Sequence, residues 1–415
     1  MEPTRRELLQ LAVAAWSAGC LREPRGRIAP VTTAVLEPDH ASFLVAIATP
    51  RRVAEATVEI RGRRAVRTVR AALVDGIAAV EITDLAPDTA YEVTVLVDAG
   101  RGGTHRVRTA PRPDDPRPVR LAIIADVDPR PEFVSGLFDA LVAEAPELII
   151  AIGDFPYADE GTPQHSVAQY RARHAAVRGH PDVRAVLEAA GVRAIYDDHE
   201  YGNDWDRTLA EADPAAYAAA LRVWDEFFPL RTTGEIRYRS WRWGANLECF
   251  LLDCRRFRGR NAAPDDAAKT MLGATQRAWL RDGVARSTAT FKLILTSVPL
   301  DFGVGDDHWA AYTTERDALF AELVDVPGVV FVSGDQHWFA AHRHAYGIRE
   351  MQIGPLARGL GTPGPTAPGV LFRAVRYNAG LIELDAEHLT LAGLGADGER
   401  FYSETLDVAA LTPRR

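Results

Sequence analysis

The chain has 415 residues, of which 47% are hydrophobic and 25% are charged, the proportions of an ordinary soluble globular protein. This length predicts about two domains. The net charge of −9 excludes a protein that holds nucleic acid through bulk positive charge, and we expect no specific nucleic-acid binding.

Residues 1–27 are expected to be an export signal that is not part of the fold. Arg5 and Arg6 precede an apolar run at 11–16, and small residues then lead to Cys20. A basic start, a short apolar core and a small-residue ending are typical of a secretory signal, and paired arginines indicate the twin-arginine route. We predict a periplasmic, cell-surface or secreted protein, with Cys20 as the candidate site of a lipid anchor. The alternative is a short amphipathic leader on a cytoplasmic protein.

Residues 28–110 show β-type patterns only. Seven short β-rich runs follow one another closely, which predicts an antiparallel sandwich; they lie at 31–36, 43–48, 56–60, 66–73, 78–82, 91–97 and 105–109. Leu85, Pro87, Thr89 and Tyr91 resemble the signature of fibronectin type III domains, with Tyr91 as the corner tyrosine. The segment carries no catalytic cluster, so we expect it to pack against the next domain.

A proline-rich linker at 111–118 separates this segment from residues 119–415. Beyond it, strands alternate with helices, which predicts a layered α/β domain. Apolar spacing predicts helices at 133–144, 167–178, 183–190, 215–228, 274–284 and 315–324, and strands at 247–254, 291–296 and 329–333. Two late β-like runs, 381–384 and 389–391, are expected to finish a second sheet. No feature of the sequence specifies the oligomeric state.

Four apolar runs end in carboxylates. The runs at 119–125, 147–153, 193–196 and 328–333 are followed by Asp126, Asp154, Asp197–Asp198 and Asp335. Ligands of open α/β sheets bind at the carboxyl ends of the strands, so we expect these acids to meet at one edge. Buried carboxylates are tolerated only when they are paired or bound to metal. The pattern therefore predicts a metal cluster.

Two further side chains extend this cluster. Tyr157 follows Asp154 by three residues in a turn, and His337 follows Asp335 by two. An oxygen-rich set with one histidine suits hard ions such as iron(III), manganese, calcium or magnesium. Two such ions can clamp the attacking and leaving oxygens of a phosphoryl transfer. No serine-nucleophile motif and no P-loop competes with this interpretation.

Five segments, in this order, resemble the PhoD-like alkaline phosphatases of the metallophosphoesterase superfamily. They are GDFPY at 153–157, DDHEYGNDW at 197–205, LDCRRFR at 252–258, LGATQRAWL at 272–280 and SGDQH at 333–337. The similarity spans about residues 119–345. It implies a metallophosphoesterase-type α/β sandwich that follows the fibronectin-like domain.

The resemblance also implies a ligand set. One ion would be held by Asp126, Asp154, Tyr157 and His337, and the other by Asp154, Asp198 and Asp335, with Asn203 a weaker candidate. It implies iron(III) with calcium, with zinc or manganese as alternatives. Asp126 stands where PhoD-like enzymes often have cysteine, and Asp128 is a candidate extra ligand. The segment 295–299 lacks the superfamily's upstream histidine, so the second site is expected to be dominated by oxygen ligands.

The implied activity is hydrolysis of small-molecule or lipid phosphate esters, of the alkaline phosphatase or phosphodiesterase type, by a hydroxide held at the two-metal centre. We expect His199 to protonate the leaving oxygen or to stabilise the charged phosphoryl group, and Arg255 to bind phosphate oxygens. The alternatives are a catalytically inactive cell-surface binding protein, and phospholipase D-like or nucleotide pyrophosphatase activity at the same site.

Each site residue also has a purely structural interpretation. Asp126 and Asp154 would be helix N-caps, Tyr157 a core aromatic, and His199 a structural histidine. Arg255 and Arg258 would pair with surface acids. The segment 306–309, which resembles a family motif that lines the cleft, would be an exposed turn.

Overall fold

The computed structural model describes residues 31–415, except for 51, 64, 99, 161–164, 232–233 and 235. The predicted export signal, with Arg5, Arg6 and Cys20, lies outside the described residues. Within them, no helix has both the length and the apolar character that are needed to cross a bilayer.

A nine-stranded sheet carries three of the four predicted carboxylate-bearing strands. Its order is β20 (Arg400–Asp407), β19 (His388–Gly395), β18 (Asn378–Leu384), β8 (Val119–Ile124), β9 (Leu148–Ile152), β10 (Gly191–Ile195), β1 (Thr32–Leu36), β2 (Phe43–Ala48) and β5 (Ile77–Ile82). Strands β8, β9 and β10 are parallel, with Leu148 of β9 opposite both Leu121 and Gly191. Their carboxyl ends therefore lie side by side.

A seven-stranded sheet carries the fourth predicted carboxylate-bearing strand. Its order is β11 (Arg239–Trp243), β12 (Leu247–Leu251), β13 (Phe291–Leu295), β14 (Val329–Ser333), β16 (Arg349–Gln352), β15 (Phe339–Arg343) and β17 (Val370–Ala374). Strands β12, β13, β14 and β16 are parallel to one another. The prediction that all four carboxylate-bearing strands end at the edge of one sheet was wrong, because β14 belongs to this second sheet.

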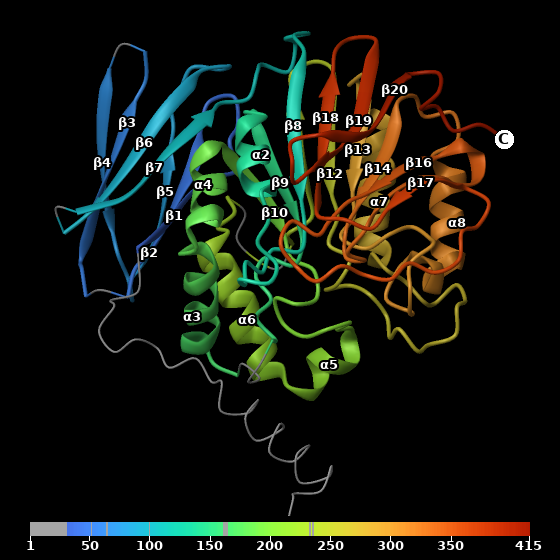
Figure 1. The fold of residues 1–415 in the computed structure, drawn as a ribbon, viewed down its shortest axis with the longest axis horizontal. Helices are drawn as coiled ribbons and strands as arrows, with labels where there is room; N and C mark the ends of the chain where they lie inside the picture. The colour runs from blue at the N-terminus through green and yellow to red at the C-terminus, as the bar shows by residue number, and fades with distance from the viewer. Residues whose placement is uncertain are drawn as a thin grey trace, which may run out of the picture.

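The two sheets pack face to face, and alternation along their strands explains why (Figure 1). Leu121 and Ile123 of β8 share one hydrophobic cluster with Val330 and Val332 of β14. Their neighbours along each strand face outward toward helices. Strands buried on both faces are continuously apolar, as β8 is from Leu121 onward and β14 is from Val329 to Val332.

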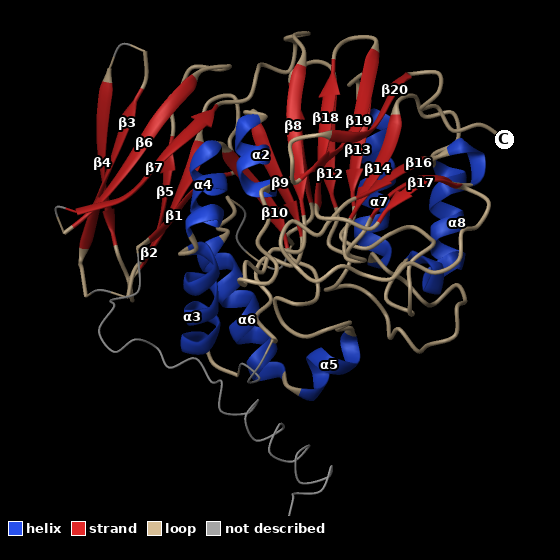
Figure 2. Cartoon of the chain, viewed as in Figure 1, coloured by secondary structure: helices blue, strands red, loops and turns tan. Residues whose placement is uncertain are grey.

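Helices cover both outer faces (Figure 2). Helices α2 (Leu137–Ala143), α3 (Val167–Arg178), α4 (Pro181–Ala189) and α6 (Pro214–Phe227) pack on the nine-stranded sheet, and α7 (Gly273–Arg286) and α8 (Thr313–Glu322) pack on the other. The short helices α5 (Arg207–Ala212), η1 (Trp309–Tyr312) and η2 (Ala345–Gly347) lie in connections. Ser166 and Asp213 cap α3 and α6 by accepting backbone N–H bonds. The result is the predicted α/β sandwich.

Two elements differ from their predictions. The runs at 381–384 and 389–391 belong to β18 and β19, which pair beside β8 and so extend the first sheet, where we had predicted a second. Helix α2 begins only at Leu137, because the preceding residues form a turn in which the Phe133 N–H donates to the Arg130 carbonyl at 2.9 Å. The spacing of apolar residues in the sequence does not predict such a turn.

The N-terminal strands form a sandwich that shares a sheet with the rest of the chain. Strands β3 (Glu55–Arg61), β4 (Val66–Ala72), β6 (Ala90–Val97) and β7 (Gly100–Arg108) form a four-stranded sheet, which packs on β1, β2 and β5. The Tyr91 hydroxyl accepts the Ala86 N–H at 2.9 Å, the geometry of a tyrosine corner. Strand β1 then joins β10 in parallel, with Leu36 opposite Val192.

The segment 111–118 is held against the second sheet. The Ala245 N–H donates to the Asp115 carbonyl at 2.7 Å, and Asn246 Nδ2 donates to the Pro116 carbonyl at 2.8 Å. Both acceptors meet the turn between β11 and β12, so this segment is fixed to the turn at two points.

The hydrophobic core between the two sheets sets the spacing of the strand ends. Truncation of a side chain in this core should therefore destabilise the protein. Leu293→Ala removes a fully buried side chain of β13 and should lower the free energy of unfolding by about 2–5 kcal/mol. Leu371→Ala, at a β17 side chain that is 49% exposed, should change it by less than about 0.5 kcal/mol. Denaturant unfolding of both variants measures the difference, and equal losses would contradict this packing.

Candidate metal centre

Turns that follow four strands bring the predicted acids together from both sheets. Asp126 and Asp154 follow β8 and β9, and Asp198 follows β10. The first two turns are joined directly, since the Val127 N–H donates to the Asp154 carbonyl at 2.8 Å. Asp335 and His337 follow β14 and arrive from the facing sheet.

Four of these residues have left-handed backbone conformations. The φ angle is 59° at Asp126, 57° at Asp154, 75° at Asp335 and 62° at His337. Such a conformation is uncommon for residues with a Cβ and costs of order 1–3 kcal/mol each. The tertiary structure thus holds these side chains in directions that an extended chain would not give them.

One group of ligand atoms lies between Asp126, Asp154 and His337. A single oxygen or nitrogen from each lies within 4.8 Å of the other two, and the Tyr157 hydroxyl is 2.7 Å from His337 Nε2. Both Asp126 oxygens and Asp154 Oδ2 are buried and have no hydrogen-bond partner among the described residues. Burial, with the neighbouring acids, raises the pKa of both carboxyls well above their usual range. Orphaned buried carboxylate oxygens of this kind fit a cation.

A second set of acids is contiguous with the first. Asp154, Asp198 and His199 offer ligand atoms within 4.8 Å of one another, and so do Asp197, Asp198 and Asp335. Asp154 belongs to the first group as well, so its carboxylate lies where two ions would share it. The donor set is dominated by oxygen, which suits hard cations.

The His337 ring is oriented by its own loop. Its Nδ1 contacts the Gly359 carbonyl at 2.7 Å, which leaves Nε2 toward Tyr157 and Asp126. Burial lowers the pKa of His337 to about 4, so the neutral, metal-binding form prevails at neutral pH. Tyr157 is fully buried, and its ring lies over His199 with 4.1 Å between ring centroids.

Gly354 gives the Asp126 carboxylate its space. Its φ is +99°, and an added Cβ would lie 2.0 Å from Asp126 Oδ2. Asn378 fixes this glycine by accepting its N–H at 2.9 Å. No side chain fits here, so the backbone itself forms the wall beside Asp126.

His199 lies at the edge of the acid cluster. Its Nδ1 is 2.9 Å from both oxygens of Asp159, and its backbone N–H donates to Asp198 Oδ1 at 3.0 Å. Burial alone would lower the pKa of His199, but Asp198 and the bond to Asp159 outweigh it and raise the pKa to about 9. With Nδ1 committed to Asp159, Nε2 is the ring nitrogen that remains for other partners.

Arg255 is placed differently from the expectation that it binds phosphate. Its side chain is 0% exposed. It donates to Asp197 at 2.6 and 2.9 Å, to Asp307 at 2.9 and 2.5 Å, and to the Trp205 carbonyl at 3.4 Å. These contacts occupy the five N–H donors of a guanidinium. Arg255 therefore lies beneath the acids, 3.7 Å from Asp198 and 3.9 Å from Asp335.

The two weaker ligand candidates have other surroundings. Asp128 is buried against three arginines, with Arg130 at 2.7 Å, Arg173 at 3.0 Å and Arg358 at 3.0 Å. Its carboxylate oxygens are thereby satisfied without a metal. Asn203 is exposed, and its backbone N–H donates to Asp159.

Sequence reasoning left three buried acids out of the site. Asp197 accepts bonds from Arg255 and Ser297. Glu200 accepts the N–H groups of Phe155 and Asp197 at 2.8 and 3.0 Å, which ties two of the turns together. Asp307 is buried and pairs with Arg255 and Arg258, although an exposed turn was the alternative for it. All three lie in segments that resemble family motifs, and this resemblance was the feature of the sequence that could have identified them.

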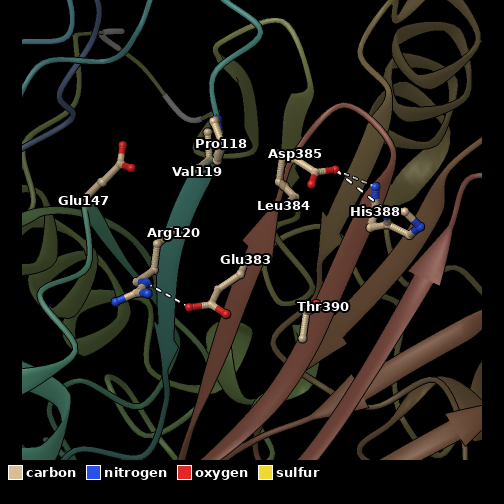
Figure 3. Close-up of a pocket in the computed structure, with 9 residues that line it drawn as sticks. All are labelled: Pro118, Val119, Arg120, Glu147, Glu383, Leu384, Asp385, His388 and Thr390. Atoms are coloured by element: carbon tan, nitrogen blue, oxygen red, sulfur yellow. Dashed lines mark hydrogen bonds and ion pairs between the residues drawn. The ribbon is translucent and has the colours of Figure 1, made fainter.

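A surface hollow of about 350 Å³ lies far along β8 from this centre (Figure 3). It is lined at the amino-terminal end of β8 by Pro118, Val119 and Arg120, and Arg120 pairs with Glu383 at 2.8 Å. None of the predicted site residues lines it. The candidate chemistry therefore belongs to the opposite end of the strand.

Comparisons with known proteins give the family of the chain. The family model described as PhoD-like phosphatase matches residues 133–358, more than half of the chain. Alkaline phosphatase D of Bacillus subtilis (strain 168) is 27% identical over 206 residues, which are 41% of this chain and 35% of that protein. The matched part thus spans about a third of the relative's length.

Two solved structures share the fold over nearly the whole chain. A structure of PhoD superposes with a TM-score of 0.77 at 17% identity and covers 92% of this chain and 90% of that one. The purple acid phosphatase PPD1 from yellow lupin (Lupinus luteus) seeds gives 0.66 at 15% identity, with 91% and 74% covered. The chain belongs to the PhoD-like phosphatase family.

Proposed function

We propose that this protein hydrolyses phosphate esters at a two-metal centre. The observation that carries the proposal is that both Asp126 oxygens and Asp154 Oδ2 are buried without a partner among the described residues, beside His337 and Tyr157. Family membership supports the same reaction class. The substrates would be small-molecule or lipid phosphate esters.

The ligand assignment follows the two groups of acids. Asp126, Asp154, Tyr157 and His337 would hold one ion, and Asp154, Asp198 and Asp335 the other. Ions bound there supply charge neutralisation for the phosphoryl group and make hydroxide available near neutral pH. Iron(III) with calcium is the pair we propose, with zinc or manganese as alternatives, because the donors are mostly hard oxygens.

His199 would donate a proton to the leaving oxygen as its bond to phosphorus breaks. Asp159 accepts the Nδ1–H, fixes the ring and leaves Nε2 for the leaving group. Arg255 would act through the acids as a positioning residue. Its bonds to Asp197 and Asp307, and its charge near Asp198 and Asp335, hold the carboxylates in place.

The segment boundaries are also proposals. We assign 28–110 to a fibronectin-like domain and 119–415 to the catalytic domain. We propose that residues 1–27 direct export by the twin-arginine route, with Cys20 as the candidate lipid-anchor site. An unprocessed amino terminus in mass spectrometry of protein from its native host would contradict export.

Removal of metal should abolish turnover. We expect elemental analysis of the purified protein to find about two metal equivalents, and stringent chelation to stop hydrolysis of aryl phosphates until ions are restored. Asp126→Asn should lower the metal content together with turnover. Metal-free protein, or metal without turnover on any phosphate monoester or diester, would favour the alternative of a binding protein.

The role of His199 can be tested through the leaving group. His199→Ala should lower kcat by about 10²–10⁴-fold for an alkyl phosphate, whose leaving oxygen needs a proton. The loss should be much smaller for p-nitrophenyl phosphate, whose leaving group is stable as an anion. Steady-state kinetics on both substrates make the comparison, and equal losses on both would exclude His199 as the acid.

Arg255→Met tests the positioning role against phosphate binding. The change leaves Asp197 and Asp307 buried with less countercharge, so the free energy of unfolding should fall by about 3–5 kcal/mol. Denaturant unfolding measures this loss. Unchanged stability with a raised KM would instead show that Arg255 contacts the substrate.

A further inference from the structure

The arrangement leaves open which cation binds the phosphate oxygens of a substrate. Arg255, which was expected to bind phosphate, and Arg258 of the same motif are both enclosed: Arg255 has an acceptor for each donor, and the Arg258 side chain is also 0% exposed and pairs with Asp307. Arg358 is a different case. Its side chain is 14% exposed, so it is both held by the protein and open to solvent.

Arg358 lies directly beside the candidate metal centre. Its guanidinium carbon is 4.3 Å from the centroid of the Tyr157 ring, and the Tyr157 hydroxyl is 2.7 Å from His337 Nε2. The next residue in the chain, Gly359, provides the carbonyl that orients His337. Two independent connections therefore place this cation at the ligands of the first group.

The Arg358 head group is oriented but not saturated. Nη1 donates to Asp128 at 3.0 Å and Nη2 to Glu160, and the guanidinium also lies over Phe133 at 5.3 Å. Among the described residues these contacts use fewer than half of its five N–H donors. Arg255, by contrast, has an acceptor for each donor. A fixed guanidinium with free donors is pre-organised for phosphate.

The surrounding charge also favours an anion. Arg130, Arg173 and Arg358 surround Asp128 and Glu160, so this cluster carries one net positive charge. The acids hold the arginines in place without cancelling them. This excess contrasts with the net charge of −9 on the whole chain.

We propose that Arg358 binds the non-bridging phosphate oxygens of the substrate and favours phosphomonoesters over phosphodiesters. This inference rests on the proposed function. A monoester carries about two negative charges near neutral pH and a diester one, and the attraction to a fixed cation grows with that charge. Monoester binding should therefore depend more on Arg358 than diester binding does.

The test compares Arg358→Met and Arg358→Lys with the wild type and with Arg316→Met. Arg316 is a matched control on α8: its side chain is 12% exposed, pairs with Asp301 at 2.8 Å and lies over the Phe320 ring. The measurements are KM and kcat for p-nitrophenyl phosphate and bis(p-nitrophenyl) phosphate. Calorimetry of inorganic phosphate on the metal-loaded proteins gives binding without turnover.

Arg358→Met should weaken phosphate binding and raise the monoester KM by roughly ten- to hundredfold, the effect of losing hydrogen bonds between charged groups. The diester KM should rise only a few-fold. Arg358→Lys should recover part of the phosphate affinity, because it restores charge but not the fork of donors. Arg316→Met should match the wild type, and metal content should be unchanged throughout.

Unchanged phosphate affinity in Arg358→Met, or equal losses for monoester and diester, would overturn the proposal. If Arg358→Met does not fold, the phosphate affinity of Arg358→Lys decides. If Arg358 were only a structural charge, Arg358→Lys would bind phosphate as tightly as the wild type does. A wild type that hydrolyses no ester but binds phosphate, with that binding weakened in Arg358→Met, would remove the proposed function and keep Arg358 as an anion ligand. A metal-loaded wild type that binds no phosphate would overturn the inference itself.

Discussion

The structure depends on how it compensates the mutual repulsion between buried carboxylates that meet at the ends of strands. Asp126, Asp154, Asp198 and Asp335 are largely or wholly enclosed, and their ligand atoms lie only a few ångströms apart. Like charges at such distances in a poorly hydrated interior are strongly unfavourable unless countercharge is present. Arg255 supplies part of this countercharge, and the proposed metal ions would supply the rest.

Those cations are of two kinds. Arg255 is a permanent part of the fold and is fixed between Asp197 and Asp307. It compensates the acids from beneath but has no donor to spare. On the other side, the oxygens of Asp126 have no hydrogen-bond partner among the described residues, and the proposed metal ions would bind there. In this division the guanidinium donors of Arg255 are all taken by acceptors within the protein.

The packing of the two sheets sets the geometry of the site. Asp126, Asp154 and Asp198 arrive on the nine-stranded sheet, whereas Asp335 and His337 arrive on the seven-stranded one. Their separation is fixed by the apolar side chains between the sheets, such as Leu121 and Val332. Left-handed backbone at four of these positions then turns each side chain inward. The packing of the core between the sheets therefore also fixes the geometry of the candidate ligands.

The sequence by itself determined the layered α/β class, most helices and the acids that gather, because hydrophobic period and strand-end carboxylates are local patterns. Only the tertiary structure decided that β14 belongs to a second sheet and that β18 and β19 extend the first, since strand pairing is a long-range choice. It also decided which charged side chains are neutralised by partners within the protein. Arg255 and Asp128 are of residue types that can bind phosphate and metal, but their partners, Asp307 and Arg358, are distant in the chain. Whether a charged group is free or neutralised depends on such distant neighbours, and no local pattern contains them.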